Sequence, residues 1–326
     1  MDRITVIIVN WNGKTMLSKC LEGLRKQVYQ RFSTIVVDNG STDGSIEFVK
    51  QCYPEVKVIA LSENIGFAAA NNVALRNIST EYVALINNDG VAQPQWLNEM
   101  IKALDAHPGA GFAASKMVYY DTPDIIDRAG DAYTIAGAGS LRGRGASAQS
   151  YNQMNWIFGA CAGAALYRMR MLNDIGLFDE DFFILYEDVD LSFRAQLSGY
   201  RCLYIPQALV YHMATRSIGY DTAKSVYFGH RNMEWTYIHN MPTKLIVRTM
   251  LPHFLYIVFA FIFFTLKGHG RVYLKAKKDA LLGLGRAIQK RKKVQTCCRV
   301  NHHYIGRLFD SEYFFSRYFH RLRQNS

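Results

Sequence analysis

The chain has 326 residues, of which 49% are hydrophobic and 20% are charged, so it can bury a large core and is not intrinsically disordered. Its net charge of +11 is concentrated at one end, because 17 of the 38 Lys and Arg but 3 of the 27 Asp and Glu lie from residue 241 onward. This split predicts a near-neutral globular part followed by a basic segment that meets an anionic partner.

Strand and helix signals alternate over the first 120 residues. Strands are expected at 4–10, 32–39, 56–61 and 81–89, separated by helices at 14–27, 43–52, 66–78 and 94–106. Continuous apolar strands with helices between them predict an α/β fold in which a mostly parallel sheet carries helices on both faces.

Polar residues follow three of these strands, in the segments Asn10-Trp11-Asn12, Asp38-Asn39-Gly40-Ser41 and Asn87-Asn88-Asp89. Ligands of such sheets bind beyond the carboxyl ends of the strands, so these clusters outline a site. Asp89 is a hard oxygen ligand of the kind that Mg²⁺ or Mn²⁺ uses beside phosphate oxygens. Taken alone, Asp38 fits an ordinary capped turn equally well, and for Asp89 alone a strand-ending Asx turn is the favoured interpretation.

The middle of the chain is less regular. Residues 121–152 are rich in Gly, Ala and Ser without a clear period, which predicts an irregular connection. A strand is expected within 155–169, then a short helix and loop over 170–183. A strand pair is expected over 201–212, ending at His212. A lone histidine is more often structural than a ligand, so the role of His212 depends on its neighbours.

Acidic residues crowd at the start of the next predicted helix. Glu187, Asp188 and Asp190 lie in its first turn, and Arg194 follows Asp190 by four residues. One interpretation is purely structural, because first-turn acids suit the helix dipole and Asp190 can pair with Arg194. The other is that one of the acids is a catalytic carboxylate.

The segment 241–326 combines a basic face at 275–293 with an unbroken apolar run of 13 residues, 254–266. A membrane-spanning helix needs about 20 apolar residues, so an in-plane or re-entrant helix is favoured. Apolar and aromatic residues beside clustered Lys and Arg indicate an anionic membrane surface. Nucleic acid also binds basic segments, but no nucleic-acid-binding module is present, and we expect no such partner.

The expected compartment is the cytosolic side of the membrane. The N-terminal "MDRITVIIVNWNG" has an apolar run too short for an export signal. The cysteines lack paired metal spacing and mostly stand in apolar segments, which predicts buried thiols in a reducing compartment. The six are Cys20, Cys52, Cys161, Cys202, Cys297 and Cys298.

Four motifs together, "VNWNG", "VVDNGSTDGS", "LINNDG" and "GLFDEDFFILYEDVDLSFR", resemble glycosyltransferase family 2, whose members are inverting enzymes with the GT-A fold. The resemblance extends from Thr5 to Asn232, and "YFGHRNMEW" is similar to a Tyr…Arg-Asn segment of the same group. The overall pattern is nearest to rhamnosyltransferase-like members that build bacterial surface polysaccharides. It implies a GT-A domain over 1–240, followed by the helical membrane-associating region that the composition of 241–326 predicts.

The resemblance also implies roles for individual residues. Asp188 matches the general base, and Asp89 with His212 matches the site of a divalent cation, Mg²⁺ or Mn²⁺. Asn87 replaces the first Asp of the family's Asp-x-Asp motif, which removes one negative charge there. The nucleotide-sugar side comprises Asn10, Asn12, Asp38, Asn39, Asn64, Asn87 and Asn88. Acceptor contact or support is expected of Trp156, Glu187, Arg194 and Arg231, with core packing an equal alternative for Trp156.

The implied activity is transfer of a sugar from a UDP- or dTDP-sugar, dTDP-rhamnose among them, to a hydroxyl of a saccharide acceptor. A lipid-linked acceptor would explain attachment to the cytoplasmic face of the membrane, and a homo-oligomer is compatible with the sequence. One alternative is a sugar nucleotidyltransferase, which would need a Gly-rich loop with Arg and Lys after the first strand; "NWNGKT" supplies one Gly and one Lys. A non-catalytic binding protein with the same fold is the other.

Overall fold

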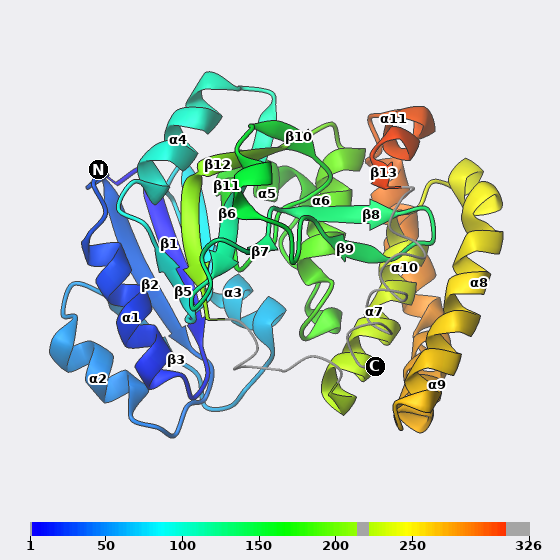
Figure 1. Ribbon diagram of the computed structural model, residues 1–326, viewed down its shortest axis with the longest axis horizontal. Helices are drawn as coiled ribbons and strands as arrows, with labels where there is room; N and C mark the ends of the chain where they lie inside the picture. Colours follow the sequence, from blue (N-terminus) through cyan, green and yellow to red (C-terminus); the bar gives the residue numbers. More distant parts are fainter. Residues whose placement is uncertain (1, 214–221, 311–326) are drawn as a thin grey trace.

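The computed structural model describes residues 2–213 and 222–310. Within them, a ten-stranded sheet forms the centre of the molecule (Figure 1). Its path runs β10–β12–β6–β11–β4–β1–β2–β3, with β5 paired to β12 and β7 to β6. The strands are β1 (Ile4–Asn10), β2 (Phe32–Asp38), β3 (Lys57–Ala60), β4 (Tyr82–Ile86), β5 (Gly90–Ala92), β6 (Ala110–Tyr119), β7 (Ile126–Arg128), β10 (Asn155–Ile157), β11 (Ala164–Arg168) and β12 (Arg201–His212).

The expected α/β fold is confirmed, but the main sheet is mixed rather than mostly parallel, because four of its described strand pairings are parallel and five are antiparallel. The strand directions still bring the polar clusters to one edge. β1 is parallel to β2 and β4, and β2 is parallel to β3. On the other side β6 and β12 are parallel to each other, and β11 is antiparallel to both β4 and β6. The long strands on either side of β11 therefore point the same way, so that their carboxyl ends share an edge.

Helices cover both faces of the sheet, as predicted. Alternate β1 side chains face opposite ways: Val6 and Ile8 pack in one core, and Ile7 packs in the other. The first core lies under α1 (Lys14–Arg25), α2 (Ser45–Cys52) and α4 (Trp96–Ala106). The second lies under α3 (Phe67–Leu75), α5 (Met169–Ile175) and α6 (Glu187–Leu197).

The Gly-rich segment 121–152 is more ordered than the sequence predicted. It contributes β7 to the main sheet, and β8 (Asp131–Thr134) and β9 (Gly139–Leu141) to a small second sheet completed by β13 (Phe309–Asp310). The strands β7, β8 and β9 have three or four residues each, too few to show a period of two in the sequence. Glycines with positive φ, among them Gly130 and Gly137, make the turns between them.

Two other predicted strands have different bounds. The single strand expected within 155–169 is two strands, β10 and β11, with a connection at 158–163 between them. The strand pair expected over 201–212 is one strand, β12, whose pairing with β6 shifts between Ile205 and Leu209. Pro206 lies in this bulge, where the lack of an N–H group costs no ladder hydrogen bond.

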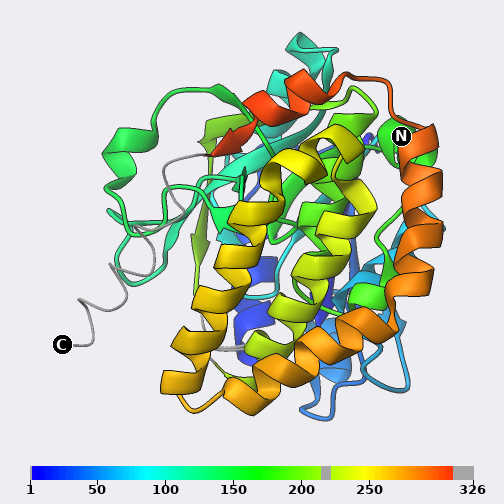
Figure 2. The same ribbon diagram turned by 90° about the vertical axis from the view of Figure 1, so that its right-hand side faces the viewer.

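Helices form the remaining, C-terminal part of the described chain (Figure 2). They are α7 (Ala223–Asn240), α8 (Thr243–Leu266), α9 (Gly270–Leu282), α10 (Leu284–Thr296) and α11 (His302–Arg307). One core cluster joins Phe193 of α6 and Tyr237 of α7 to Leu245 and Ile305, so the helices after residue 240 share a core with the sheet-bearing part. Residues 311–326 of the expected basic region lie outside the described residues.

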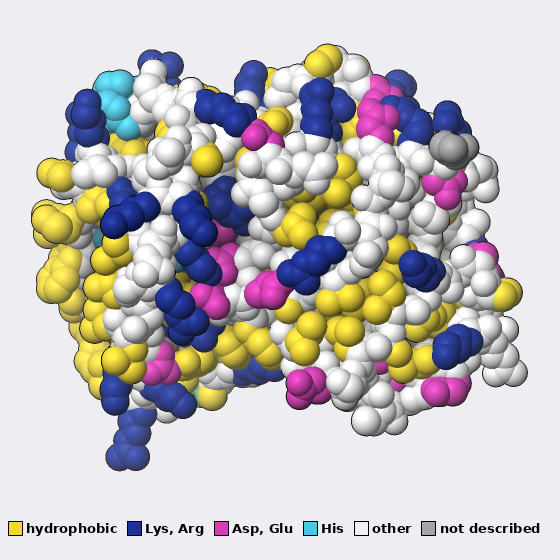
Figure 3. All heavy atoms as spheres, turned by 180° about the vertical axis from the view of Figure 1, so that it is seen from behind, with side chains coloured by type: hydrophobic (Ala, Val, Ile, Leu, Met, Phe, Trp, Pro, Cys, Tyr) yellow, Lys and Arg dark blue, Asp and Glu magenta, His cyan; other side chains and the backbone are white. Residues whose placement is uncertain are grey.

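The helix α8 has an exposed apolar side. Among the described residues it is the one helix long and apolar enough to cross a membrane by length and composition, with a mean hydropathy of 1.9 in its most apolar window, of which 28% is buried. Seen from behind, hydrophobic side chains gather along the edge of the molecule that α8 and α9 form, with Lys and Arg beside them (Figure 3).

The cysteines are less buried than the sequence predicted. All six lie in the described residues and are free thiols, but only Cys20 and Cys202 are buried, whereas Cys52 and Cys297 are exposed. The exposed pair occupies the ends of α2 and α10, where an apolar neighbour in sequence does not imply a place in the core.

Candidate active site

A cleft of about 320 Å³ opens at the shared edge of the strands. Loops after β1, β2 and β4 form one side, and β9, the connection at 161–163 and the segment 183–189 form the other. Six residues predicted from the sequence line it: Asn39, Asn64, Asn87, Asn88, Glu187 and Asp188. Trp11, from the predicted segment Asn10-Trp11-Asn12, lines it as well. Five further lining residues carried no prediction from the sequence: Arg128, Asp131, Ser140, Tyr186 and Lys224.

Three predicted residues form the wall behind the cleft. The amide of Asn10 donates to Asp38 Oδ1 at 3.1 Å, and Asn88 donates to Asn10 Oδ1 at 2.8 Å. The other oxygen of Asp38 accepts the Ser41 N–H at 2.9 Å. Asn10 and Asp38 are at most 1% exposed, so their visible role is to fix the three strand ends relative to each other.

The remaining predicted asparagines shape the loops of the cleft. Asn12 has a positive φ of 50°, and its Oδ1 accepts the Thr42 N–H at 2.8 Å. Asn39 donates to Asn64 Oδ1 at 3.1 Å, and its own Oδ1 accepts the Ile65 N–H. Both Asn39 and Asn64 thus hold the turn after β3 against the turn after β2.

Asp89 and His212 meet at the neighbouring strand ends. Asp89 Oδ1 lies 3.2 Å from His212 Nε2, and neither buried atom has any other hydrogen-bond partner among the described residues. Adjacent ligands of an octahedral cation with bonds of about 2.1 Å lie about 3 Å apart, so this pair fits two corners of a divalent cation site. The described residues contain no cluster of three or more His, Cys, Asp or Glu for a metal. A cation that also binds substrate phosphates needs one or two protein ligands.

The ring of His212 lies between two carboxylates. Its Nδ1 is 2.9 Å from Asp127 Oδ2, on the side opposite Asp89. Burial lowers the pKa of His212, but the hydrogen bond to Asp127 and the charge of Asp89 outweigh it and raise the pKa to about 9. The two carboxylates therefore surround the imidazole with negative charge, and a divalent cation can take the place of the proton on the ring.

The strand β7 connects this pair to the predicted base. Asp127 contacts His212, and the next residue, Arg128, lies 3.7 Å from Asp188 Oδ2 and 3.3 Å from Asp131 Oδ1. Burial raises the pKa of Asp127, but His212, Arg144 and Arg128 outweigh it and hold that pKa below its ordinary value. No motif in the Gly-rich sequence marked Asp127 or Arg128 as site residues.

Asp188 lies in the first turn of α6, with 11% of its side chain exposed. Its Oδ2 accepts the Ala162 N–H at 3.3 Å, and its Oδ1 accepts the Val189 N–H at 2.8 Å. The helix N-terminus and Arg128 both favour negative charge at this position. A carboxylate oriented in this way at the cleft wall can accept a proton from a bound hydroxyl.

Strained backbone leads into Asp188. Phe183, Leu185 and Tyr186 have positive φ values of 63°, 67° and 73°, which are unfavourable for residues with side chains. The buried amide of Asn232 holds this loop by donating to the carbonyls of Phe182, Ile184 and Leu185 at 2.7–2.9 Å. These hydrogen bonds hold the loop in its unfavourable backbone conformation, and backbone held in this way is typical of functional sites.

Arg231 supports the same loop rather than lining the cleft. Its guanidinium donates to the carbonyls of Asp181 and Phe182 at 2.8 and 3.1 Å, and it lies 4.3 Å from the ring centroid of Trp235. Of the two expectations for Arg231, acceptor contact or support, the geometry shows support.

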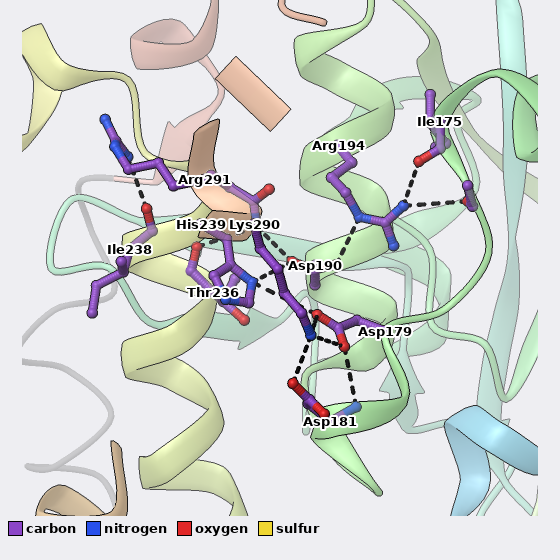
Figure 4. A network of polar contacts seen from close by, with 12 residues as sticks. Ile175, Asp179, Asp181, Asp190, Arg194, Thr236, Ile238, His239, Lys290 and Arg291 are labelled. Atoms are coloured by element: carbon purple, nitrogen blue, oxygen red, sulfur yellow. Dashed lines mark hydrogen bonds and ion pairs between the residues drawn. The ribbon is translucent and has the colours of Figure 1, made fainter. Parts of the chain in front are cut away.

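Arg194 and Asp190 form a structural network (Figure 4). Arg194 Nε donates to Asp190 Oδ2 at 2.8 Å, and its other nitrogens donate to the carbonyls of Ile175, Gly176 and Leu177. From α10, Lys290 reaches Asp179 and Asp181 beside it. The first-turn acids of α6 therefore serve both interpretations: Asp190 stabilises the helix, and Asp188 faces the cleft.

Trp156 does not join these residues. It lies on β10 opposite Leu203, near the start of β12, whereas His212 ends that strand. Its ring is covered by the Arg201 guanidinium at 3.7 Å and is 39% exposed. Stacking of Trp156 on a sugar in the cleft is therefore inconsistent with its place, because it stands at the opposite end of the sheet.

Known proteins are similar to this chain in sequence. The chain is 26% identical over 270 residues to N-acetylglucosaminyl-diphospho-decaprenol L-rhamnosyltransferase of Mycobacterium tuberculosis, covering 73% of this chain and 83% of that protein. It is also 29% identical over 234 residues to an uncharacterized protein of Sinorhizobium fredii, covering 67% of this chain but only 25% of the relative.

Solved structures share the fold. S. aureus TarS 1–349 in complex with UDP-GlcNAc has a TM-score of 0.58 and 19% identity, with 91% of each chain covered. The mannosyltransferase PcManGT from Pyrobaculum calidifontis in complex with GDP-Man and Mn²⁺ has a TM-score of 0.56 and 18% identity, with 90% of this chain and 84% of that one covered. Both are GT-A glycosyltransferases.

A family model described as glycosyl transferase family 2 matches residues 5–176, which is more than half of the chain. These residues include the strand ends that line one side of the cleft and the β7 residues that contact His212 and Asp188. The chain therefore belongs to glycosyl transferase family 2 and is a glycosyltransferase with the GT-A fold.

Proposed function

We propose that this glycosyltransferase moves a sugar from a UDP- or dTDP-sugar to a hydroxyl of a lipid-linked saccharide in cell-surface polysaccharide synthesis. The proposal rests on one observation: β7 connects the Asp89–His212 pair to Asp188, which lines the cleft, through the adjacent residues Asp127 and Arg128. The name of the mycobacterial relative supports dTDP-rhamnose as the first donor to test and a lipid diphosphate sugar as the acceptor.

The donor would occupy the side of the cleft formed by the strand ends. Amide side chains of Asn39, Asn64, Asn87 and Asn88 line it and offer both donors and acceptors to a nucleotide. Asn10 and Asp38 fix these loops from behind. Trp11 is 46% exposed at the rim, with Lys224 Nζ 5.4 Å from its ring, and the two could meet a base and a phosphate.

Asp89 and His212 would hold a divalent cation at the diphosphate. When bound, such a cation stabilises the negative charge that develops on the leaving diphosphate. The replacement of the first motif Asp by Asn87 leaves a site with one carboxylate and one imidazole, a pair that suits Mn²⁺ as well as Mg²⁺.

The acceptor hydroxyl would react on the side of Asp188. Its oxygen forms a bond to the anomeric carbon as the bond from that carbon to the diphosphate oxygen breaks, and the electron pair leaves with the diphosphate. Asp188 accepts the hydroxyl proton. A single displacement of this kind inverts the anomeric centre. Glu187, whose pKa is raised well above its ordinary value by burial and by Asp188, can donate a hydrogen bond at the same wall.

The enzyme would bind the cytoplasmic face of the membrane through α8 and α9, as a peripheral or monotopic membrane protein. Exposed apolar residues recur every three or four positions along α8, at Val247, Met250, Leu251, Phe254, Leu255, Val258, Phe259, Ile262 and Leu266. Exposed Lys and Arg accompany them, at Lys244, Arg248, Lys267, Arg271, Lys275 and Lys278. An apolar stripe fringed by cations suits an anionic bilayer and would keep the enzyme beside a lipid-linked acceptor.

The products of the reaction test the proposed function. The purified protein is incubated with Mn²⁺, a lipid-linked saccharide and UDP-, dTDP- or GDP-sugars. We expect release of UDP or dTDP together with an acceptor that is larger by one sugar. Release of inorganic diphosphate instead would identify a nucleotidyltransferase and contradict the proposal.

A further inference from the structure

We propose that Asp127 is a positioning residue that fixes the His212 imidazole as a ligand for the divalent cation, an inference that rests on the proposed function. Asp127 is the middle residue of β7 and is 1% exposed. Its Oδ2 lies 2.9 Å from His212 Nδ1, which turns Nε2 toward Asp89. The sequence reasoning gave Asp127 no role.

The chemistry of histidine ligands supports this role. A histidine that binds a metal through one nitrogen usually donates its other N–H to a carboxylate or carbonyl, which fixes the tautomer and the ring orientation. With Asp127 held against Nδ1, Nε2 is the ring nitrogen left for a cation beside Asp89. Nε2 of His212 and Oδ1 of Asp89 are both buried, lie 3.2 Å apart and have no further hydrogen-bond partner among the described residues, so a shared cation would serve both.

Asp127 is itself held in place. Arg144 donates to its other oxygen, Oδ1, and also to the Tyr119 hydroxyl at 3.2 Å. Tyr119 is the residue of β6 that stands opposite His212 in the register of β12. The contacts therefore run in a continuous series from Arg144 through Asp127 and His212 to Asp89, and a carboxylate fixed on both oxygens leaves the imidazole little freedom to rotate.

Metal binding measured apart from turnover tests the inference. Mn²⁺ is titrated into the full-length protein with saturating UDP, and free Mn²⁺ is followed by electron paramagnetic resonance. Spin-echo modulation of the bound Mn²⁺ then reports coupling to a histidine ¹⁴N. The variants are D127A and D127N. The matched control is D124N, which removes an exposed acidic charge three residues away on the same segment.

We expect D127A to bind Mn²⁺ about 10- to 100-fold more weakly than wild type and to weaken the ¹⁴N coupling, with D124N unchanged. D127N keeps an acceptor oxygen but no charge, so a smaller loss of Mn²⁺ affinity, about 3- to 10-fold, is expected. If D127A does not fold, D127N alone tests the inference. Wild-type affinity and coupling in the folded Asp127 variants would overturn the inference and leave the transfer function intact. A wild-type protein that binds neither Mn²⁺ nor UDP would end the proposed function and the inference with it.

Discussion

Glu187 and Asp188 are neighbours in sequence but have different surroundings. Asp188 accepts two backbone N–H groups and lies near Arg128. Glu187 is buried, and its Oε2 has no hydrogen-bond partner among the described residues. Burial and the charge of Asp188 raise the pKa of Glu187 well above its ordinary value, so the folded protein retains this proton to a higher pH than the unfolded chain does. A buried acid of this kind costs stability at neutral pH.

The cost of Glu187 has a definite pH dependence. Above pH 4.5 the unfolded chain releases the proton that the folded protein retains, so the free energy of unfolding falls as the pH rises toward the folded-state pKa. Glu187→Gln keeps a neutral side chain of similar shape with no proton to retain. We expect the variant to be more stable than wild type at pH 7.5, by a gap that grows by up to about 1.4 kcal/mol per pH unit.

Urea unfolding of both proteins between pH 4.5 and 7.5 measures this gap. Glu63→Gln, at an exposed position, is the matched control and should show no pH-dependent difference from wild type. A gap between E187Q and wild type that is the same at both ends of this pH range would contradict the raised pKa.

Single residues were predictable where a motif carried them. Asp188, Asp89 and Asn88 stand at strand ends or a helix start, and the direction of parallel strands forces such positions to one edge of the sheet. Asp127 and Arg128 belong to a three-residue strand in a Gly-rich segment, and their contacts with His212 and Asp188 are set by tertiary folding alone. For Trp156, stacking on a sugar and core packing stayed equal alternatives, because a sequence does not show which end of a sheet an edge strand joins.

At the scale of elements, α8 makes a prediction about membranes. Leu251 and Phe254 are 66% and 59% exposed on its apolar stripe. Burial of each side chain in a bilayer is worth about 1.5–3 kcal/mol, so the double variant L251E/F254E should bind vesicles at least about 100-fold more weakly than wild type. Cosedimentation with vesicles containing an anionic phospholipid measures the partitioning, and higher salt should weaken wild-type binding as well.

The matched control for this variant is V28E/M154E, which places two glutamates at exposed apolar positions outside α8 and α9. Both double variants should act normally on a short, water-soluble acceptor, because neither touches the cleft. Vesicle binding by L251E/F254E at the wild-type level would refute the membrane role of this face.

The elements themselves differed in how far the sequence revealed them. Long apolar strands and amphipathic helices of the first 120 residues were predictable because each has enough residues to show its period. The short strands β7, β8 and β9 were not, and the apolar run 254–266 indicated only part of the 24-residue helix α8. The flanking 243–253 is helical because it packs against the rest of the chain through Leu245, Thr249 and His253.

At the scale of the whole molecule, the basic C-terminal helices are attached to the catalytic side. Lys290 of α10 reaches Asp179 and Asp181, just before the strained loop, and Arg291 donates to the carbonyls of Ile238 and Met241 (Figure 4). Burial lowers the pKa of Lys290, but Asp179 and Asp181 outweigh it and raise the pKa above its ordinary value. The helix α10 thus packs against the segment that precedes α6, the helix that carries Asp188.

The central claim is that Asp188 takes the proton of the acceptor hydroxyl in a cleft whose nucleotide side is independent of it. Asp188→Asn keeps the side-chain shape but removes the base. The most direct measurement compares this variant with wild type for both UDP or dTDP binding in Mn²⁺, by titration calorimetry, and sugar transfer. We predict binding within about threefold of wild type and transfer reduced by about 10²- to 10⁴-fold. Transfer at the wild-type rate in the variant would contradict the account.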